Sequence, residues 1–274
     1  MSMIEDVNSF VKNHLPFLVL LSVVLILSAV TVVVSPRGPE VPKLENTYQL
    51  FGPSIAAFVL LMSIGSYLSY RYYVKTPPRS DTLYQLIWGV SFMIFSLTFL
   101  GLCLQALGFD FADMNQPAIF LVWRTPMIVW VAGMWIGTIQ LFTENKLNIY
   151  LPAILILGLG LLWFVFGLLV QENIEQTMYG FLFAEFIPMA IILAYLWFVY
   201  TKDTELTSPR ILVIGFSLLA ITYAAWAPWH FTDLVYLYFV WFNLFIVSLG
   251  FIFAGFFALP KETTTRVVTE DDFG

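Results

Sequence analysis

Two charged residues lie deep inside long apolar runs of this chain. Arg124 falls in the run 118–142, and Glu185 falls in the run 177–200. An arginine at membrane depth costs about 2.5 kcal/mol or more on insertion scales, so it usually marks a structural or functional site with a partner. A guanidinium that faces a carboxylate can form two hydrogen bonds at once. We therefore predict that Arg124 and Glu185 pair across their two helices.

Three interpretations of these charges stay open at this stage. A buried pair can simply fix the register of the two helices. The same groups can form a site for a ligand or an ion, or Arg124 can extend to the outer head groups. Structural pairing predicts that Glu185→Gln lowers the thermal stability of the protein in detergent.

The composition is that of a polytopic membrane protein. Apolar residues make up 60% of the chain, charged residues make up 11%, and the mean hydropathy is +0.86, whereas about a quarter of the residues in soluble domains are charged. A net charge of −6 argues against nucleic acid as a partner, because there is no cationic face to neutralise phosphates. The single cysteine, Cys103, excludes an intrachain disulfide and a cysteine-based metal site.

The apolar runs predict an all-α bundle of about eight transmembrane helices. Each run has about the 20 residues that span a bilayer, and the runs cover 17–34, 52–74, 84–107, 118–142, 149–170, 177–200, 211–229 and 234–258. We interpret 17–34 as a retained helix because no small-residue cleavage site follows it; its removal would leave seven helices. One domain then covers 1–259, and the polar, acidic tail 260–274 is expected to lack regular structure.

Basic residues predict the orientation of the helices, because Lys and Arg are enriched in cytoplasmic connections. One side receives Arg37 and Lys43, whereas the other receives most of the remaining basic residues: Lys12, Arg71, Lys75, Arg79, Lys146, Lys202, Arg210, Lys261 and Arg266. We therefore predict a multi-pass protein of the cell membrane with both termini in the cytoplasm.

Five polar residues are candidates for a site in the outer half of the membrane. At about 1.5 Å per helical residue, Arg124, Glu185, Tyr223 and Asn243 all lie about 9 to 13 Å below the outer surface. His230 lies at the outer end of the run 211–229, where it is either an interfacial residue or a sensor of external pH. The sequence therefore predicts one polar layer shared by four helices.

Prolines close to this layer favour a cavity. Pro126, Pro188 and Pro228 each leave a backbone carbonyl without its helical donor. At membrane depth such carbonyls must be satisfied by side chains, water or neighbouring helices. We expect a wet or ligand-filled cavity in the outer half.

Small residues at a spacing of four occur on two of the predicted helices. Gly133 and Gly137 lie in the run 118–142, and Gly250 and Ala254 lie in the run 234–258. This spacing permits close approach of helix backbones. We expect the helix 118–142 to be packed centrally.

No catalytic motif is present, so we do not expect an enzyme. The sequence lacks H-E-x-x-H, G-x-S-x-G and a phosphate-binding glycine loop. We expect no cofactor or metal, because His14 and His230 are predicted on opposite faces and cannot both ligate one haem.

The predicted function is therefore non-enzymatic. We expect a membrane protein that binds a small amphipathic ligand or lipid in an outer-half cavity, as a sensor-like module or as a subunit of a membrane complex. The alternatives are a secondary transporter or channel, for which proline-broken helices are typical, and a haem-free quinone-binding subunit of a redox complex. The expected partners are the lipid bilayer, the ligand and other membrane proteins.

Overall fold

The computed structural model describes residues 44–75, 83–114, 116–204, 206–230 and 235–271. Every regular element in these ranges is helical. Seven of the described helices are long and apolar enough to cross a membrane, and they coincide with the predicted runs from 52–74 onward. The predicted first span, 17–34, lies outside the described residues.

Most of the spans are single helices, but three contain a π-helical turn. The elements are α2 (Leu44–Tyr70) with a π turn at Arg71–Lys75, α3 (Leu83–Ala106), α4 (Pro117–Ile139), α5 (Lys146–Val165) with a π turn at Phe166–Val170, α6 (Ile174–Phe181), a π turn at Leu182–Phe186, α7 (Ile187–Thr204), α8 (Thr207–His230) and α9 (Val235–Asp271). The segments from α6 to α7 form one span. A π turn widens the helix locally and is frequent at functional sites.

Local sequence explains where several helices begin. The side chain of Asn145 accepts a hydrogen bond from the Leu147 amide at 3.0 Å and caps α5. Asn173 caps α6 in the same way, by accepting from the Gln176 amide at 2.9 Å. Asparagine is a preferred N-cap because it satisfies an amide that has no helical acceptor. Pro117 opens α4, where its missing N–H costs nothing.

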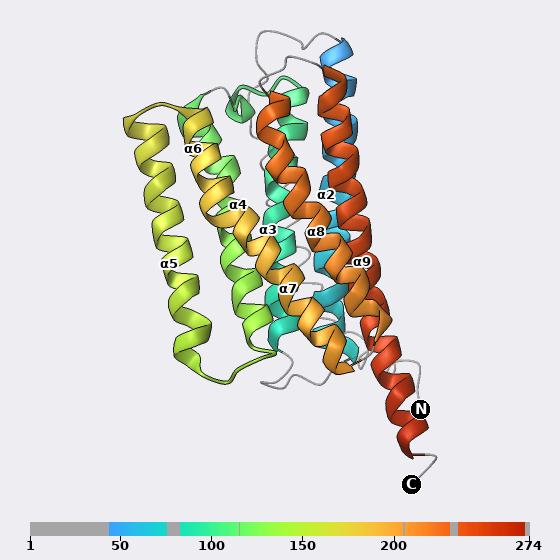
Figure 1. Ribbon diagram of the computed structural model, residues 1–274. Coiled ribbons are helices and arrows are strands. Elements are labelled where there is room, and N and C mark those ends of the chain that lie inside the picture. The colour runs from blue at the N-terminus through green and yellow to red at the C-terminus, as the bar shows by residue number, and fades with distance from the viewer. Residues whose placement is uncertain (1–43, 76–82, 115, 205, 231–234, 272–274) are drawn as a thin grey trace, which may run out of the picture.

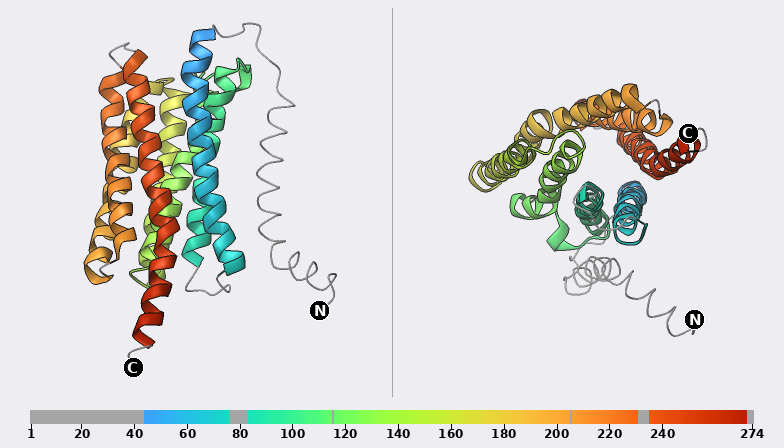
Figure 2. Two further views of the ribbon diagram at one scale, coloured as in Figure 1. Left: turned by 90° about the vertical axis from the view of Figure 1, so that its right-hand side faces the viewer. Right: turned by 90° about the horizontal axis from the view of Figure 1, so that it is seen from below.

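The helices are arranged in two layers. Figure 2 shows α2, α3 and α4 on one side of the bundle and α7, α8 and α9 on the other, with α5 at one edge. Helices that follow each other in the chain pack together, and α9 returns to α2. The span in α3 is 67% buried, whereas the span that begins at Lys146 in α5 is 28% buried. The central position therefore belongs to α3, and the expectation that the helix 118–142 is packed centrally was wrong, because the span in α4 is 44% buried. Helix α5 is peripheral (Figure 1).

Aromatic side chains fill the space between the two layers. Trp130 of α4 lies 5.1 Å from the ring of Phe95 and stacks on Phe186 at 5.0 Å. Phe99 of α3 stacks on Phe245 of α9 at 4.8 Å. Stacked and edge-to-face ring pairs add stability beyond the area that they bury. The interior is therefore closely packed at the level of these rings.

Close approach of α4 to α3 depends on the predicted glycines. A Cβ atom on Gly137 would lie 2.5 Å from Trp88, and one on Gly133 would overlap Ser91. The prediction of a close helix contact at Gly133 and Gly137 is confirmed. A Cβ atom on Gly250 of α9, in contrast, would meet no atom of a neighbouring element within 4 Å among the described residues.

The expectation that the tail lacks regular structure was wrong. Helix α9 extends through residue 260 to Asp271, and Figure 1 shows it projecting beyond the bundle. Adding residues to an existing helix does not require a new nucleus. A polar segment can therefore continue the helix without burying apolar surface.

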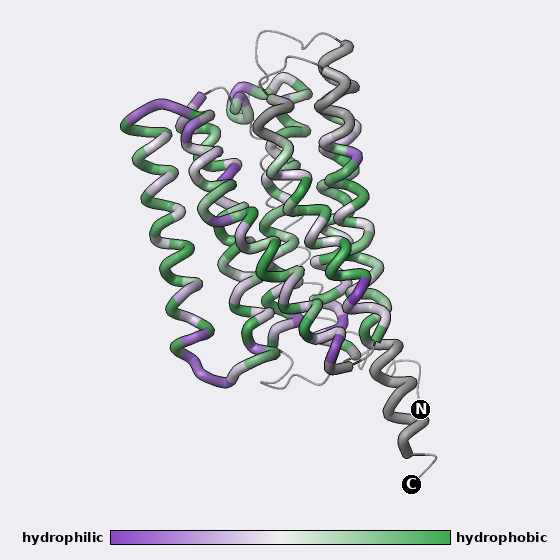
Figure 3. Tube along the Cα trace, viewed as in Figure 1, coloured by the Kyte–Doolittle hydropathy of each residue, from purple (hydrophilic) through white to green (hydrophobic). Residues whose placement is uncertain are grey.

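Figure 3 shows hydrophobic residues along the spans and hydrophilic ones near their ends.

Candidate functional site

Glu185 lies in the π turn Leu182–Phe186, where this span contacts α4 and α5. A Cβ atom on Gly160 of α5 would lie 2.8 Å from Oε2 of Glu185 and 2.8 Å from Cγ2 of Ile128. The carboxylate therefore occupies the space that a side chain at position 160 would need. Glycine at this position makes room for it.

The Glu185 carboxylate carries unused hydrogen-bonding capacity. Its Oε2 atom is buried and has no hydrogen-bond partner among the residues that the structure describes. Buried polar atoms are nearly always hydrogen-bonded, so each exception needs an explanation. The Glu185 side chain as a whole is half-buried, so part of it lies at the surface of the described structure.

Arg124 lies on α4 and contacts an aromatic ring. Its guanidinium carbon is 5.2 Å from the centroid of the Phe120 ring, within the range of a cation–π interaction. Within the described part of the chain, no ion pair joins Arg124 to Glu185. The prediction that these two residues pair was wrong.

The positions of these residues along their helices explain why Arg124 and Glu185 do not pair. Ile128, not Arg124, meets the space beside Glu185, and Arg124 lies one turn, or about 6 Å, further toward the predicted outer end of α4.

The structure brings Tyr223 close to the Glu185 segment. Tyr223 is 4% exposed, and its ring lies 4.3 Å from Phe186 and 5.5 Å from Trp241. Asn243 of α9 is exposed and does not join this packing. His230 ends α8, and its side chain lies outside the described part of the structure. Aromatic rings therefore surround Tyr223 at the level where the sequence predicted a polar layer.

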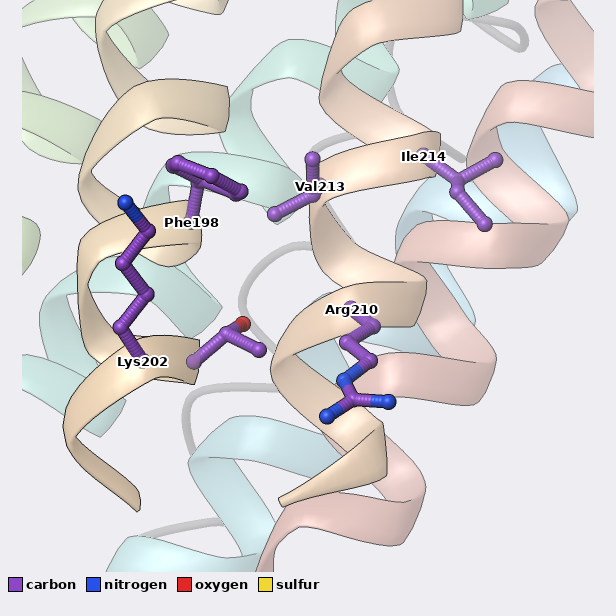
Figure 4. A pocket seen from close by; sticks show the side chains of 6 residues that line it. Phe198, Lys202, Arg210, Val213 and Ile214 are labelled. Atoms are coloured by element: carbon purple, nitrogen blue, oxygen red, sulfur yellow. The ribbon is translucent and has the colours of Figure 1, made fainter. Parts of the chain in front are cut away.

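A cavity of about 510 Å³ lies between α7 and α8, far from Glu185. Its walls are Phe198, Thr201, Lys202, Arg210, Val213 and Ile214 (Figure 4). Lys202 is about 25 Å from Glu185 along the helix axis. Sequence reasoning missed this cavity because two cations at helix ends and a few apolar residues are ordinary features of membrane helices.

The fold and these residues define a polytopic helical membrane protein. Among the described residues, no group of three or more His, Cys, Asp or Glu is placed to hold a metal ion. Comparison with protein-family models, curated proteins and solved structures finds no match to this chain.

Proposed function

We propose that this protein is a non-enzymatic membrane protein that binds a small amphipathic ligand or lipid beside Glu185. It acts as a sensor-like module or as a subunit of a membrane complex, with both termini in the cytoplasm and Glu185 in the outer half of the bilayer. The observation that carries the proposal is the buried Oε2 atom of Glu185, which has no hydrogen-bond partner among the described residues. A ligand that donates a hydrogen bond to this oxygen would be stabilised beside Glu185.

The surroundings of the carboxylate indicate the chemistry of the ligand. A hydrogen bond to a charged group is worth about 1.5–3 kcal/mol, so a hydroxyl or amine on the ligand would bind here. The space beside the carboxylate is apolar, because the side chain of Ile128 of α4 and the bare backbone of Gly160 of α5 border it. An amphipathic molecule would place its polar group on Glu185 and its apolar part against Ile128.

Other predicted residues support this arrangement indirectly. Tyr223 packs on Phe186, the residue after Glu185, and so holds the π turn in place from α8. Arg124 lies one turn nearer the predicted outer surface with its guanidinium against the Phe120 ring, and it stays a prediction as a ligand-binding residue. Asn243 and His230 stay predictions as ligand-binding residues.

A haem-free quinone-binding subunit is the second candidate. Phe186 follows Glu185 in the sequence, and its ring stacks on that of Trp130 with the centroids 5.0 Å apart. A carboxylate beside aromatic rings can take up a proton from a quinol. Iron–sulfur or flavin absorbance in partner chains that purify with the protein would favour this candidate.

The test is retention of a ligand by the full chain. The protein is purified in mild detergent and analysed by native mass spectrometry as wild type and as the Glu185→Gln and Glu144→Gln variants. Glu144 is exposed in the connection between α4 and α5, so its variant is the matched control. We expect the bound ligand to be lost from Glu185→Gln only. Equal retention by all three proteins would overturn the proposal.

A further inference from the structure

The cavity between α7 and α8 combines two cations with an apolar wall. Thr201 forms its floor and is 9% exposed, whereas Phe198 and Ile214 are each 46% exposed at its rim. Lys202 and Arg210 are exposed as well. The cavity is therefore an open groove on the surface that faces the lipid.

Among the lining residues that the structure describes, none offers an anionic partner to the two cations. The ammonium of Lys202 lies 4.6 Å from the centroid of the Phe198 ring, and Figure 4 shows the Arg210 guanidinium directed toward the end of the helices. The remaining lining residues are Thr201 and three apolar residues. The hydroxyl of Thr201 donates to the Trp197 carbonyl at 2.9 Å, so its donor is already used. Positive charge is thus the distinctive polar feature of the groove.

An exposed apolar stripe continues the groove along both helices. On α7, Ile191 and Tyr195 are 56% and 62% exposed, and their spacing to Phe198 and Lys202 places all four on one helix face. On α8, Ile221 is 58% exposed and shares a face with Ile214 and Arg210. The stripe from Lys202 to Ile191 is about 16 Å long. This length matches half of the bilayer hydrocarbon, which is about 30 Å thick.

We propose that this groove binds an anionic phospholipid. Its phosphate binds at the end of the groove that Arg210 and Lys202 line from the two facing helices, and one acyl chain follows the stripe toward Ile191 and Ile221. The first turn of α8, which begins at Thr207, adds the positive end of the helix dipole. Basic pockets between transmembrane helices on the cytoplasmic side recognise anionic head groups. The predicted orientation places this end of the bundle in the cytoplasm.

Charge excludes the common neutral lipid as the preferred occupant. A zwitterionic head group brings its own cation, which would lie close to Lys202 and Arg210. An anionic head group leaves its negative charge for these two side chains. The groove should therefore prefer phosphatidylglycerol to phosphatidylcholine.

Native mass spectrometry of the full chain in mild detergent tests this preference. Phosphatidylglycerol and phosphatidylcholine are titrated onto wild type, onto the double variant Lys202→Gln with Arg210→Gln, and onto the charge-keeping exchange Lys202→Arg with Arg210→Lys. We expect the affinity of the double glutamine variant for phosphatidylglycerol to fall about 30-fold, since each basic residue near a membrane surface contributes roughly a factor of five. The charge-keeping exchange should stay within about threefold of wild type.

A second variant separates the acyl chain from the head group. Ile214→Trp fills the groove while both charges stay, so it should also weaken phosphatidylglycerol binding. Wild-type affinity in the double glutamine variant would overturn the proposal, and so would equal affinity for both lipids. Full displacement of the lipid by millimolar inorganic phosphate would overturn it too, because the site would then be one for free phosphate.

Discussion

The Glu185 site and the α7–α8 groove both place charge between helices, but they differ in burial. The Oε2 atom of Glu185 is buried and lies beside Gly160 and Ile128, whereas Lys202 and Arg210 are exposed. A buried polar atom is costly until a partner arrives, so it selects a partner of defined geometry. An exposed cation costs little and attracts any suitable anion that reaches the interface. The first site should therefore be the more sensitive to substitution.

The largest difference in stability should be between substitutions at two glycines on α5. Gly160→Leu should lower the free energy of unfolding by about 3 kcal/mol, because overpacking of this kind costs about 1–3 kcal/mol and a Cβ atom there already lies 2.8 Å from Glu185 and Ile128. A Cβ atom on Gly158 would meet no atom of a neighbouring element within 4 Å among the described residues, so Gly158→Leu should change stability by about 0.5 kcal/mol or less. Thermal unfolding in detergent compares them, and equal effects would contradict the described packing at Gly160.

Loss of the buried hydrogen bond between Trp88 and Thr138 should give the next largest effect on stability. Trp88 donates to the hydroxyl of Thr138 at 3.2 Å between α3 and α4. Thr138→Val removes the acceptor and leaves the indole N–H buried, which costs about 1–3 kcal/mol. Thr125 donates only to the Leu121 carbonyl of its own helix, so Thr125→Val is the control and should have little effect. If both variants unfold at the same temperature as wild type, the Trp88 contact contributes nothing to stability.

Glu185→Gln should have a smaller effect on stability than either change above. The carboxylate loses no described partner, and glutamine has nearly the same shape, so we expect a change of about 0.5 kcal/mol or less. Breaking a buried ion pair instead costs about 3–5 kcal/mol. A loss of that size in chemical or thermal unfolding would restore the ion-pair interpretation.

The smallest effect on stability should come from the groove. Lys202 and Arg210 are exposed, so replacing both with glutamine should leave the unfolding temperature in neutral lipid unchanged. Phosphatidylglycerol should raise the unfolding temperature of wild type, because a ligand that binds only the folded state stabilises it. The double variant should show no such rise, and a rise equal to that of wild type would place the lipid elsewhere.

The spans could be predicted because an apolar run of about 20 residues has few other uses. The contact at Gly133 and Gly137 could also be predicted, since two small residues one turn apart leave room for a neighbouring helix. Arg124 does not pair with Glu185 because Ile128, one turn further along α4, lies beside the carboxylate. The π turn at Leu182–Phe186 has no signal that the sequence pattern reveals.

The groove could not be predicted for a different reason. Lys202 and Arg210 resemble any basic residues that flank a span, and Phe198 and Ile214 resemble any residues that face lipid. Their significance comes from the packing of α7 against α8, which places them around one cavity. Rare interior charges stand out in a sequence, whereas sites built from common residues appear only in the fold.

One native mass spectrometry series on wild type, Glu185→Gln and the double variant of Lys202 and Arg210 tests directly whether the two regions are separate sites. We predict that Glu185→Gln loses the amphipathic ligand but keeps phosphatidylglycerol, and that the double variant does the reverse. Loss of the same bound molecule from both variants would contradict the claim that the two regions are separate sites.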